Sequence, residues 1–422
     1  MKQADWKEMF KAVQENDADL LLFYIQQGID LDYQHPEYFT SALIESVRLR
    51  HSFITKTLLE NGASPEICEV ESGKTAGQIA RELNNTEAMN LLAAFSSTNL
   101  TQTNKQQPLS MSNQKMKAVI CAKYGAPEVL QIQEVVKPIA KDNEILVKIK
   151  ATAVNSGDAR VRGLAVEGIM KFIMRLVMGF SGPRKQILGT VYAGIVESVG
   201  KNVSNFKAGD KVFGMTGFDF GTYAEYIVLK ESGNIAIMPQ NASFEEAVSL
   251  IFGGQTVLYF FDKIKLAEMK KPKMLIIGAT GSVGTAALQI AKAYQAEVTA
   301  VCSSKGRSLV ESLGVSNIVC YDTTDFTQMS EKFDVIFDAV GKTTQKQCQT
   351  LLAKGGIYKT VGGMEYASES QQQLETLKTL FEQGKYRAVI DRIYPFEQIV
   401  EAHRYVDTGR KKGNVVLKME NL

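Results

Sequence analysis

The feature that most constrains this chain is a glycine-rich turn between a run of apolar residues and a predicted helix. Residues 274–277 are apolar, and after the turn apolar side chains recur at helical spacing. Glycine adopts backbone angles closed to other residues and lets helix and strand approach, so phosphate oxygens can meet N–H groups at the positive helix end. With a second apolar strand at 298–302, the pattern predicts a dinucleotide-binding turn, made of Gly278, Ala279, Thr280, Gly281, Ser282, Val283 and Gly284.

The residues after the second strand indicate which dinucleotide binds. A site for NAD usually places Asp or Glu about 20 residues past the glycines, to accept a hydrogen bond from the ribose 2′-OH. Here the chain reads Ser303-Ser304-Lys305-Gly306-Arg307, without a carboxylate. Hydroxyl and cationic side chains suit a 2′-phosphate, which forms charge-assisted hydrogen bonds. We therefore expect NADPH rather than NADH.

Length and charge limit the organisation and the partners. The chain has 422 residues, which suggests about two or three domains. Its 48 Lys and Arg residues nearly balance 46 Asp and Glu residues, so no strong field attracts nucleic acid or an anionic membrane. A small-molecule partner is expected.

The cysteines and the N-terminus indicate a cellular compartment. Five widely spaced cysteines stand mostly in apolar surroundings, which indicates free thiols in a reducing compartment rather than disulfides. The first residues are too polar for a signal peptide. We expect a cytoplasmic protein.

The longest predominantly apolar stretch covers residues 163–182. Lys171 and Arg175 interrupt it, so it falls short of the roughly 20 apolar residues that a membrane span needs. Two interpretations stay open: a surface helix packed on the core, or a methionine-rich lid over an apolar substrate.

Residues 1–95 contain an internal repeat. Gly28 and Gly62 lie 34 positions apart, and each follows a helical apolar pattern. A period near 33 is typical of ankyrin repeats, and two to three of them fit here. We expect His51 to be a structural hydrogen-bonding residue. The aromatic segment containing Tyr33, His35, Tyr38 and Phe39 either holds a protein partner or packs on its own unit.

The remaining chain divides by composition. Residues 96–115 are rich in Ser, Thr, Asn and Gln and predict a flexible linker. Short alternating strands over 116–240 predict an antiparallel β domain, and helix–strand alternation over 241–384 predicts a parallel doubly wound sheet. Residues 385–422 return to the β domain. The predicted fold is multidomain: all-α ankyrin-like repeats, then a GroES-like β domain with an inserted α/β Rossmann domain.

The motifs of residues 116–419 resemble the medium-chain dehydrogenase/reductase superfamily, and within it the zinc-free quinone oxidoreductase branch. The resemblance rests on 154–158, 189–200, 206–214, 221–226 and 278–284, quoted in one-letter code as VNSGD, GTVYAGIVESVG, FKAGDKVFG, GTYAEY and GATGSVG. Zinc-dependent members need Cys and His ligands; Gly189-Thr190-Val191 stands where a histidine motif would fall, and His403 favours packing over metal binding. No metal site is expected.

The resemblance implies NADPH-dependent reduction of quinones or α,β-unsaturated carbonyls by hydride transfer. It places Asn155 beside the nicotinamide and Thr256 near its carboxamide, and it suggests Tyr259 as a donor to the substrate oxygen. It matches Ser303, Lys305 and Tyr321 to the 2′-phosphate and Asn414 to a cofactor contact. We expect Asp158 and Arg160 to form a structural ion pair.

Two departures from the family pattern stand out. The N-terminal unit is an addition, and the segment between 362 and 370 is too short for the last strand of the usual sheet, which leaves the homodimer open. An alternative to the reductase is an NADPH-binding, redox-sensing scaffold that acts through its ankyrin repeats without turnover. A zinc alcohol dehydrogenase is a third possibility, which elemental analysis would detect.

Overall fold

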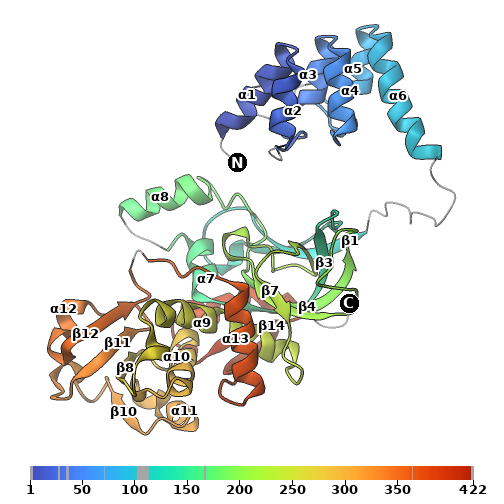
Figure 1. Cartoon of the computed structure of the whole chain (residues 1–422). Coiled ribbons are helices and arrows are strands. Elements are labelled where there is room, and N and C mark those ends of the chain that lie inside the picture. Colours follow the sequence, from blue (N-terminus) through green and yellow to red (C-terminus); the bar gives the residue numbers. More distant parts are fainter. Residues whose placement is uncertain are drawn as a thin grey trace. The chain divides into compact units, whose positions relative to one another are not determined.

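The computed structural model describes residues 3–26, 29–34, 38–70, 72–101, 114–165, 168–363 and 365–419. It forms two compact units, Met1–Ser112 and Asn113–Leu422, which we call the helical unit and the C-terminal unit (Figure 1). Gly28 and His35, singled out above, lie outside the described residues.

The helical unit contains three consecutive helix pairs among its described residues. The first and second helices of each pair stack on the matching helices of the next pair, so the unit grows by repetition (Figure 1). The helices are α1 (Gln3–Gln14), α2 (Ala18–Gln26), α3 (Ala42–Arg48), α4 (Ser52–Glu60), α5 (Ala76–Glu82) and α6 (Thr86–Thr101).

The backbone of this unit repeats every 34 residues. Asn16, Arg50 and Asn84 all have a positive φ, between 49° and 58°. The next position then binds the preceding repeat: Nδ1 of His51 lies 2.9 Å from the Val13 carbonyl, and Nδ2 of Asn85 donates to the Val47 carbonyl at 2.9 Å. The prediction that His51 is a structural hydrogen-bonding residue is confirmed.

The aromatic segment of the first repeat packs on its own unit. The ring of Tyr38 lies 4.7 Å from that of Phe10, and the ring of Tyr33 lies 5.6 Å from that of Trp6. Trp6 and Phe10 are buried, whereas Tyr33, Tyr38 and Phe39 keep about 40% of their surface exposed. Both interpretations of this segment therefore stay open.

The boundary of the expected linker differs from the structure. Helix α6 continues to Thr101, beyond the expected linker start at residue 96. The strand β1 (Lys115–Cys121) begins where the linker was expected to end. Residues 102–113 lie outside the described part.

The C-terminal unit begins with a β domain that is antiparallel, as expected, except that β13 pairs with β14 in parallel. β1 pairs with β2 (Leu130–Val136), and a seven-stranded sheet follows the order β13-β14-β3-β4-β5-β7, with β6 on β3. The strands are β3 (Glu144–Val154), β4 (Val191–Val199), β5 (Lys211–Met215), β6 (Tyr226–Lys230), β7 (Ile235–Ile237), β13 (Ile390–Pro395) and β14 (Asn414–Lys418). Helices α7 (Ser156–Gly163), α8 (Ile169–Met178) and α14 (Ile399–Asp407) flank them. Because β14 pairs with β3, the end of the chain rejoins this sheet.

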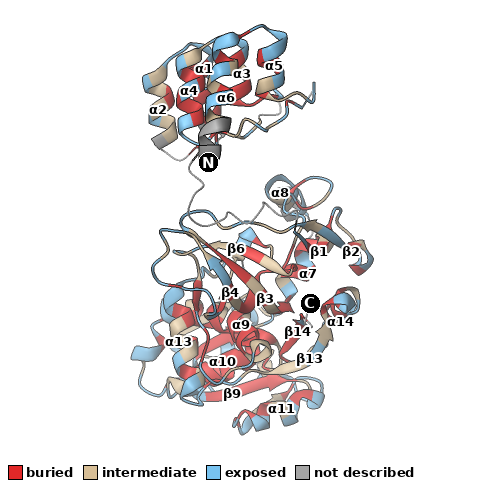
Figure 2. Cartoon of the chain, turned by 90° about the vertical axis from the view of Figure 1, so that its right-hand side faces the viewer, coloured by how far each residue is buried: buried red, intermediate tan, exposed pale blue. Residues whose placement is uncertain are grey.

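A five-stranded parallel sheet is inserted into this β domain. Its order β10-β9-β8-β11-β12 reverses beside β8, as in dinucleotide-binding sheets. The strands are β8 (Lys273–Ile277), β9 (Glu297–Cys302), β10 (Asn317–Cys320), β11 (Phe333–Asp338) and β12 (Leu352–Thr360). The helices are α9 (Phe244–Lys263), α10 (Ser282–Ala293), α11 (Arg307–Ser312), α12 (Gln345–Cys348) and α13 (Gln371–Glu382). Figure 2 shows α10 and β9 largely in the colour of buried residues, which explains why both read as apolar runs.

The sheet ends at β12. Among the described residues between β12 and α13 there is no further strand, as the short segment predicted. β12 is therefore one edge of the parallel sheet, and β10 is the other.

The predominantly apolar stretch contains helix α8. Met174 and Met178 pack against the β domain, whereas Phe172, Leu176 and Val177 are exposed. Within the described part of the chain, no helix is both long and apolar enough to cross a membrane. The helix thus combines a packed side with an exposed apolar side.

Candidate coenzyme and acceptor site

The glycine turn joins β8 to α10 in a shape that two of its glycines impose. Gly278 has φ +78°, and a β-carbon there would overlap Cγ2 of Val340. A β-carbon at Gly284 would overlap the carbonyl oxygen of Gly278. At Gly281 the nearest protein atom would be 4.0 Å away. Gly278 and Gly284 are thus required by the fold, whereas Gly281 borders open space.

The start of α10 offers unpaired N–H groups beside Gly281. The first helical bond runs from Thr285 N to Gly281 O at 2.9 Å, and Gly281 provides no side-chain cap. Among the described residues, nothing accepts from the N–H groups of the first turn, Ser282 to Gly284. Such a helix end attracts anions. These residues fit the pyrophosphate of a dinucleotide, with Gly281 giving the phosphates room to approach.

Asp338 fixes the loop that faces the glycine turn, and the sequence analysis did not identify this residue. Its buried carboxylate accepts from the backbone N–H groups of Val340, Gly341 and Thr343 at 3.0, 2.9 and 2.7 Å. These bonds fix the loop that presses Val340 over Gly278. An Asp at the end of a parallel strand, just before Gly341, was the available signal.

The end of β9 holds the residues expected to bind a 2′-phosphate. Ser303 precedes a 3₁₀ turn, Ser304–Gly306, and the ammonium of Lys305 is exposed, with no hydrogen bond or ion pair among the described residues. Arg307 pairs with Glu311 at 3.2 Å on its own helix, and both side chains are about half exposed. Its role in phosphate binding stays a prediction.

The expectation that no carboxylate lies near this site is wrong. Asp322 follows β10, the neighbouring strand, and accepts from the N–H and Oγ of Ser304 at 2.9 and 2.8 Å. These hydrogen bonds from Ser304 lower the pKa of Asp322, so the carboxylate is ionised. A search confined to the residues after β9 could not find it, because two adjacent strand ends meet only in the sheet.

Tyr321 and Asn414 have different surroundings. The ring of Tyr321 is 58% exposed at the end of β10, beside Ser303. Asn414 is buried; it accepts from Ser282 Oγ at 2.6 Å and donates to the carbonyls of Ser249 and Val389. Asn414 therefore positions the first residue of α10 rather than extending a free amide toward a cofactor.

Asn155 sits where β3 ends and α7 begins. Its Oδ1 accepts from Asp158 N at 3.0 Å, and its Nδ2 donates to Oγ1 of Thr190 at 2.8 Å. Thr190 O in turn accepts from Thr216 N at 2.8 Å. The amide of Asn155 is thus fixed at both ends, by the first turn of α7 and by Thr190.

Asp158 is a buried carboxylate without an ion pair. Its Oδ2 accepts from Tyr223 OH at 3.0 Å, and among the described residues it makes no pair with Arg160, which is exposed. The expected ion pair is therefore wrong; Arg162 forms one instead, with Asp407 at 2.6 Å. Burial raises the pKa of Asp158 to about 7, because the interior disfavours its charge.

The two expected residues on α9 are engaged with the protein. Thr256 Oγ1 donates to the Phe252 carbonyl at 2.7 Å, within the helix. Tyr259 OH donates to Glu365 at 3.3 Å and accepts from Lys263 at 3.2 Å, while Lys263 and Glu365 form an ion pair. Tyr259 and Asn155 share no hydrogen bond, so the structure does not bring the two expected catalytic residues together directly.

An exposed aromatic pair borders the segment that carries Glu365. The rings of Phe218 and Tyr366 lie 6.0 Å apart and edge to face, and each side chain is 64% exposed. Phe218 comes two residues after Thr216, which bonds to Thr190 beside Asn155. This pair spans the β domain and the inserted sheet, a juxtaposition that neither sequence segment reveals.

Metal ligands do not cluster in the part of the chain that the structure describes. No three His, Cys, Asp or Glu side chains gather there as a candidate site. Burial lowers the pKa of His403 to about 3, so the imidazole is neutral. It packs edge to face on Tyr223, consistent with the expected packing role.

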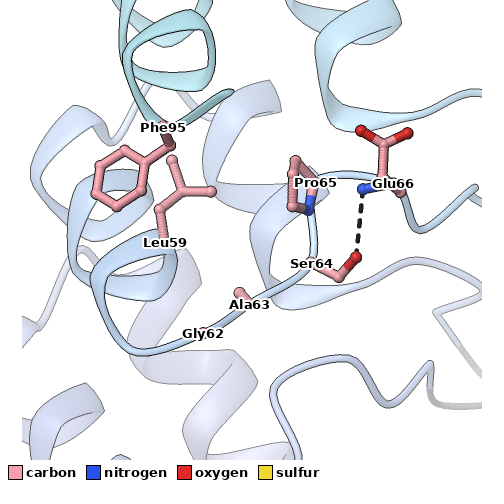
Figure 3. Close-up of a pocket in the computed structure, with 7 residues that line it drawn as sticks. All are labelled: Leu59, Gly62, Ala63, Ser64, Pro65, Glu66 and Phe95. Carbon is pink, nitrogen blue, oxygen red and sulfur yellow. Dashed lines mark hydrogen bonds between the residues drawn. The ribbon is translucent and has the colours of Figure 1, made fainter. Parts of the chain in front are cut away.

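A surface pocket lies elsewhere, in the helical unit. It has a volume of about 490 Å³, and Figure 3 shows Leu59 and Phe95 on one side and the turn 62–66 on the other. Among the residues that line it, Glu66 is the one with a charged side chain, and none is a cation. The pocket therefore offers no charge complementary to a phosphate.

Comparisons with known proteins show which family the chain resembles. Residues 141–240 match the family described as alcohol dehydrogenase GroES-like domain, and residues 282–398 match zinc-binding dehydrogenase. The chain is 32% identical over 321 residues to a 2-methylene-furan-3-one reductase of Solanum lycopersicum, covering 72% of this chain and 79% of the relative. It is 29% identical over 330 residues to a quinone oxidoreductase of Sus scrofa, covering 70% and 95%.

A solved structure shows the same fold. The quinone oxidoreductase from Coxiella burnetii superposes with a TM-score of 0.64 at 25% identity, over 73% of this chain and all of that one. A further relative by sequence, an NADPH-dependent alkenal/one oxidoreductase of Arabidopsis thaliana, is 28% identical over 320 residues, covering 72% of this chain and 79% of the relative. With its GroES-like sheet, its inserted dinucleotide-binding sheet and these relatives, the chain belongs to the medium-chain dehydrogenase/reductase superfamily.

Proposed function

We propose that this chain is an NADPH-dependent reductase of quinones or α,β-unsaturated carbonyls that works without zinc. The observation that carries the proposal is the combination of an open glycine turn with the ammonium of Lys305 at the end of β9, which makes no hydrogen bond or ion pair within the described part of the chain. The first fits a pyrophosphate and the second a 2′-phosphate. Two relatives are named as reductases or oxidoreductases of such acceptors, which supports the acceptor class.

NADPH would supply the hydride, and the protein would hold the acceptor and stabilise the charge that develops on its oxygen. Asn155 is a suitable fixed group beside the nicotinamide, because Thr190 and Asp158 hold its amide rigidly. Thr256 would lie near the carboxamide. Tyr259 would donate to the acceptor oxygen only after its hydrogen bond to Glu365 breaks. A catalytic role for Tyr259 therefore predicts a movement of the segment that carries Glu365.

The exposed rings of Phe218 and Tyr366 support an apolar, planar acceptor. Ring faces and edges bind aromatic molecules in offset or edge-on geometry. Helix α8, with its exposed Phe172 and Val177, is a candidate lid over such an acceptor.

The decisive experiment measures coenzyme oxidation with NADPH and NADH across quinones, enones and aldehydes, together with elemental analysis for zinc. We expect NADPH oxidation with quinones or enones and no stoichiometric metal. Bound zinc with alcohol turnover would overturn the proposal.

Lys305→Ala tests directly whether this lysine binds the 2′-phosphate. We expect NADPH binding to weaken about 10-fold or more, as for a lost charged hydrogen bond, and NADH binding to change little. Arg307→Ala is the matched control, because Arg307 is paired with Glu311. Equal loss for both coenzymes at Lys305 would mean that this lysine does not read the 2′-phosphate.

A redox-sensing scaffold is the second candidate, and the 34-residue recurrence of backbone geometry supports ankyrin-like repeats that could bind a protein partner. Tight NADPH binding without turnover of any acceptor would favour this candidate. The cytoplasm is the proposed location, supported by five cysteines without disulfides. A solution mass measurement would decide whether the chain forms a homodimer through the edge strand β12.

A further inference from the structure

The segment before β14 lies against the glycine turn and carries three consecutive cations, Arg410, Lys411 and Lys412. The N–H of Gly413 donates to the Thr280 carbonyl at 2.7 Å, and Gly413 forms a β-bridge with Gly281. The return segment of the β domain is therefore fixed to the pyrophosphate turn.

Of these three cations, Lys412 reaches the end of β9. Its ammonium donates to the carbonyl of Lys305 at 2.5 Å, and its backbone N–H donates to Asp391 at 2.7 Å. Lys411 instead donates to the carbonyl of Gly413 at 2.9 Å, and the exposed side chain of Arg410 has no partner among the described residues. An ammonium has three donors, so Lys412 keeps two after binding Lys305.

Charge explains why a second cation matters here. The carboxylate of Asp322, which holds Ser304, offsets the charge of Lys305 close to the expected 2′-phosphate. With one lysine and one aspartate, the end of β9 has no net charge, and a neutral site does not favour the binding of a dianionic phosphate. A second ammonium restores a net positive charge.

We propose that Lys412 is a second cation for the 2′-phosphate of NADPH, facing Lys305 from the C-terminal segment, and that it sets part of the preference over NADH. This inference rests on the proposed NADPH site and adds a specificity residue that the motif near β9 does not contain. It also couples coenzyme binding to the β domain, because Lys412 immediately precedes Gly413 and β14.

The test compares ligands that differ by one phosphate. Calorimetry on the full chain would measure dissociation constants for 2′,5′-ADP and 5′-ADP, and for NADPH and NADH. For Lys412→Gln we expect about a 10-fold loss for 2′,5′-ADP and NADPH, and less than about 2-fold for the others. Lys412→Arg keeps the charge and should retain most of the preference. Arg410→Gln, which removes the same charge two residues away, should change all four values less than about 2-fold.

The ratio between the paired ligands protects the test against partial unfolding, because an unfolded fraction lowers both apparent affinities equally. An unchanged ratio in Lys412→Gln would overturn the inference while leaving the NADPH site in place. A wild-type chain that binds neither coenzyme would overturn the proposed function as well.

Discussion

The helical unit repeats one contact along the chain, whereas the candidate coenzyme site joins segments that are distant in sequence. His51 and Asn85 each bind a carbonyl 38 residues earlier, in the neighbouring repeat. In the site, Ser282 binds Asn414 across 132 residues, and Lys412 binds Lys305 across 107. A substitution in the repeat is therefore expected to act on one layer, and a substitution at the site on several elements together.

The largest effect should come from Gly284→Ala. Its β-carbon would overlap the Gly278 carbonyl and approach Ala279, both backbone groups that cannot move freely. We expect a loss on the order of 3 kcal/mol in the free energy of unfolding of the C-terminal unit, and loss of coenzyme binding. Denaturant unfolding and NADPH titration measure the two effects.

Gly281→Ala is the matched control for this substitution. No protein atom lies within 4.0 Å of the added carbon and φ is −75°, so stability should change by about 1 kcal/mol or less. Coenzyme affinity should still fall, because the carbon occupies the approach of the phosphates. Unaltered affinity would show that the pyrophosphate binds elsewhere.

A second large effect concerns pH and Asp158. Its pKa of about 7 in the folded chain lies above the ordinary value of 3.8, so between these values the folded state holds a proton that the unfolded state releases. Stability from this group is therefore present below about pH 4 and is lost as pH rises to 7, by at most about 1.4 kcal/mol per pH unit.

Asp158→Asn removes this titration. The stability difference, variant minus wild type, should grow in favour of the variant from pH 4 to 7. The opposite contribution of His403, whose low pKa costs stability as pH falls below 6.5, cancels in that difference. Unfolding curves at pH 5, 6 and 7 that run parallel for the two proteins would contradict a buried, protonated Asp158.

Asn85→Ala should affect only the helical unit. The amide caps α6 through Ala88 N at 3.1 Å and binds the Val47 carbonyl, so we expect a loss of about 1–2 kcal/mol. His51→Ala, at the equivalent position of the previous repeat, removes the carbonyl contact without a side-chain cap and should cost less. Hydrogen exchange measures the two units separately. Loss of protection in the C-terminal unit would contradict the expectation that a substitution in the repeat acts only on its own layer.

The smallest effect should follow deletion of residues 1–113. The two units have separate hydrophobic cores, so the remaining chain should keep its coenzyme affinity within about 2-fold. A larger change would show that the helical unit acts on the site, and calorimetry of NADPH binding measures it.

The sequence by itself determined the elements and the glycine turn, because apolar periodicity and glycine placement act over a few residues. The strands β8 and β9 and helix α10 follow from such local patterns. Lys305 is a candidate from the sequence because it lies three residues after the end of β9.

Only the tertiary structure decided which groups share the site. Asp322 meets Ser304, Lys412 meets Lys305 and Tyr259 turns to Glu365 because adjacent strand ends, the return of β14 and the segment after β12 converge in space. Arg307 has a suitable charge and position in the sequence, and in the structure it forms an exposed ion pair with Glu311. Spacing in the sequence shows which side chains can contact each other within one helix or turn. A hydrogen bond, however, forms between whichever groups the folded chain brings within about 3 Å, and these groups can be far apart in the sequence.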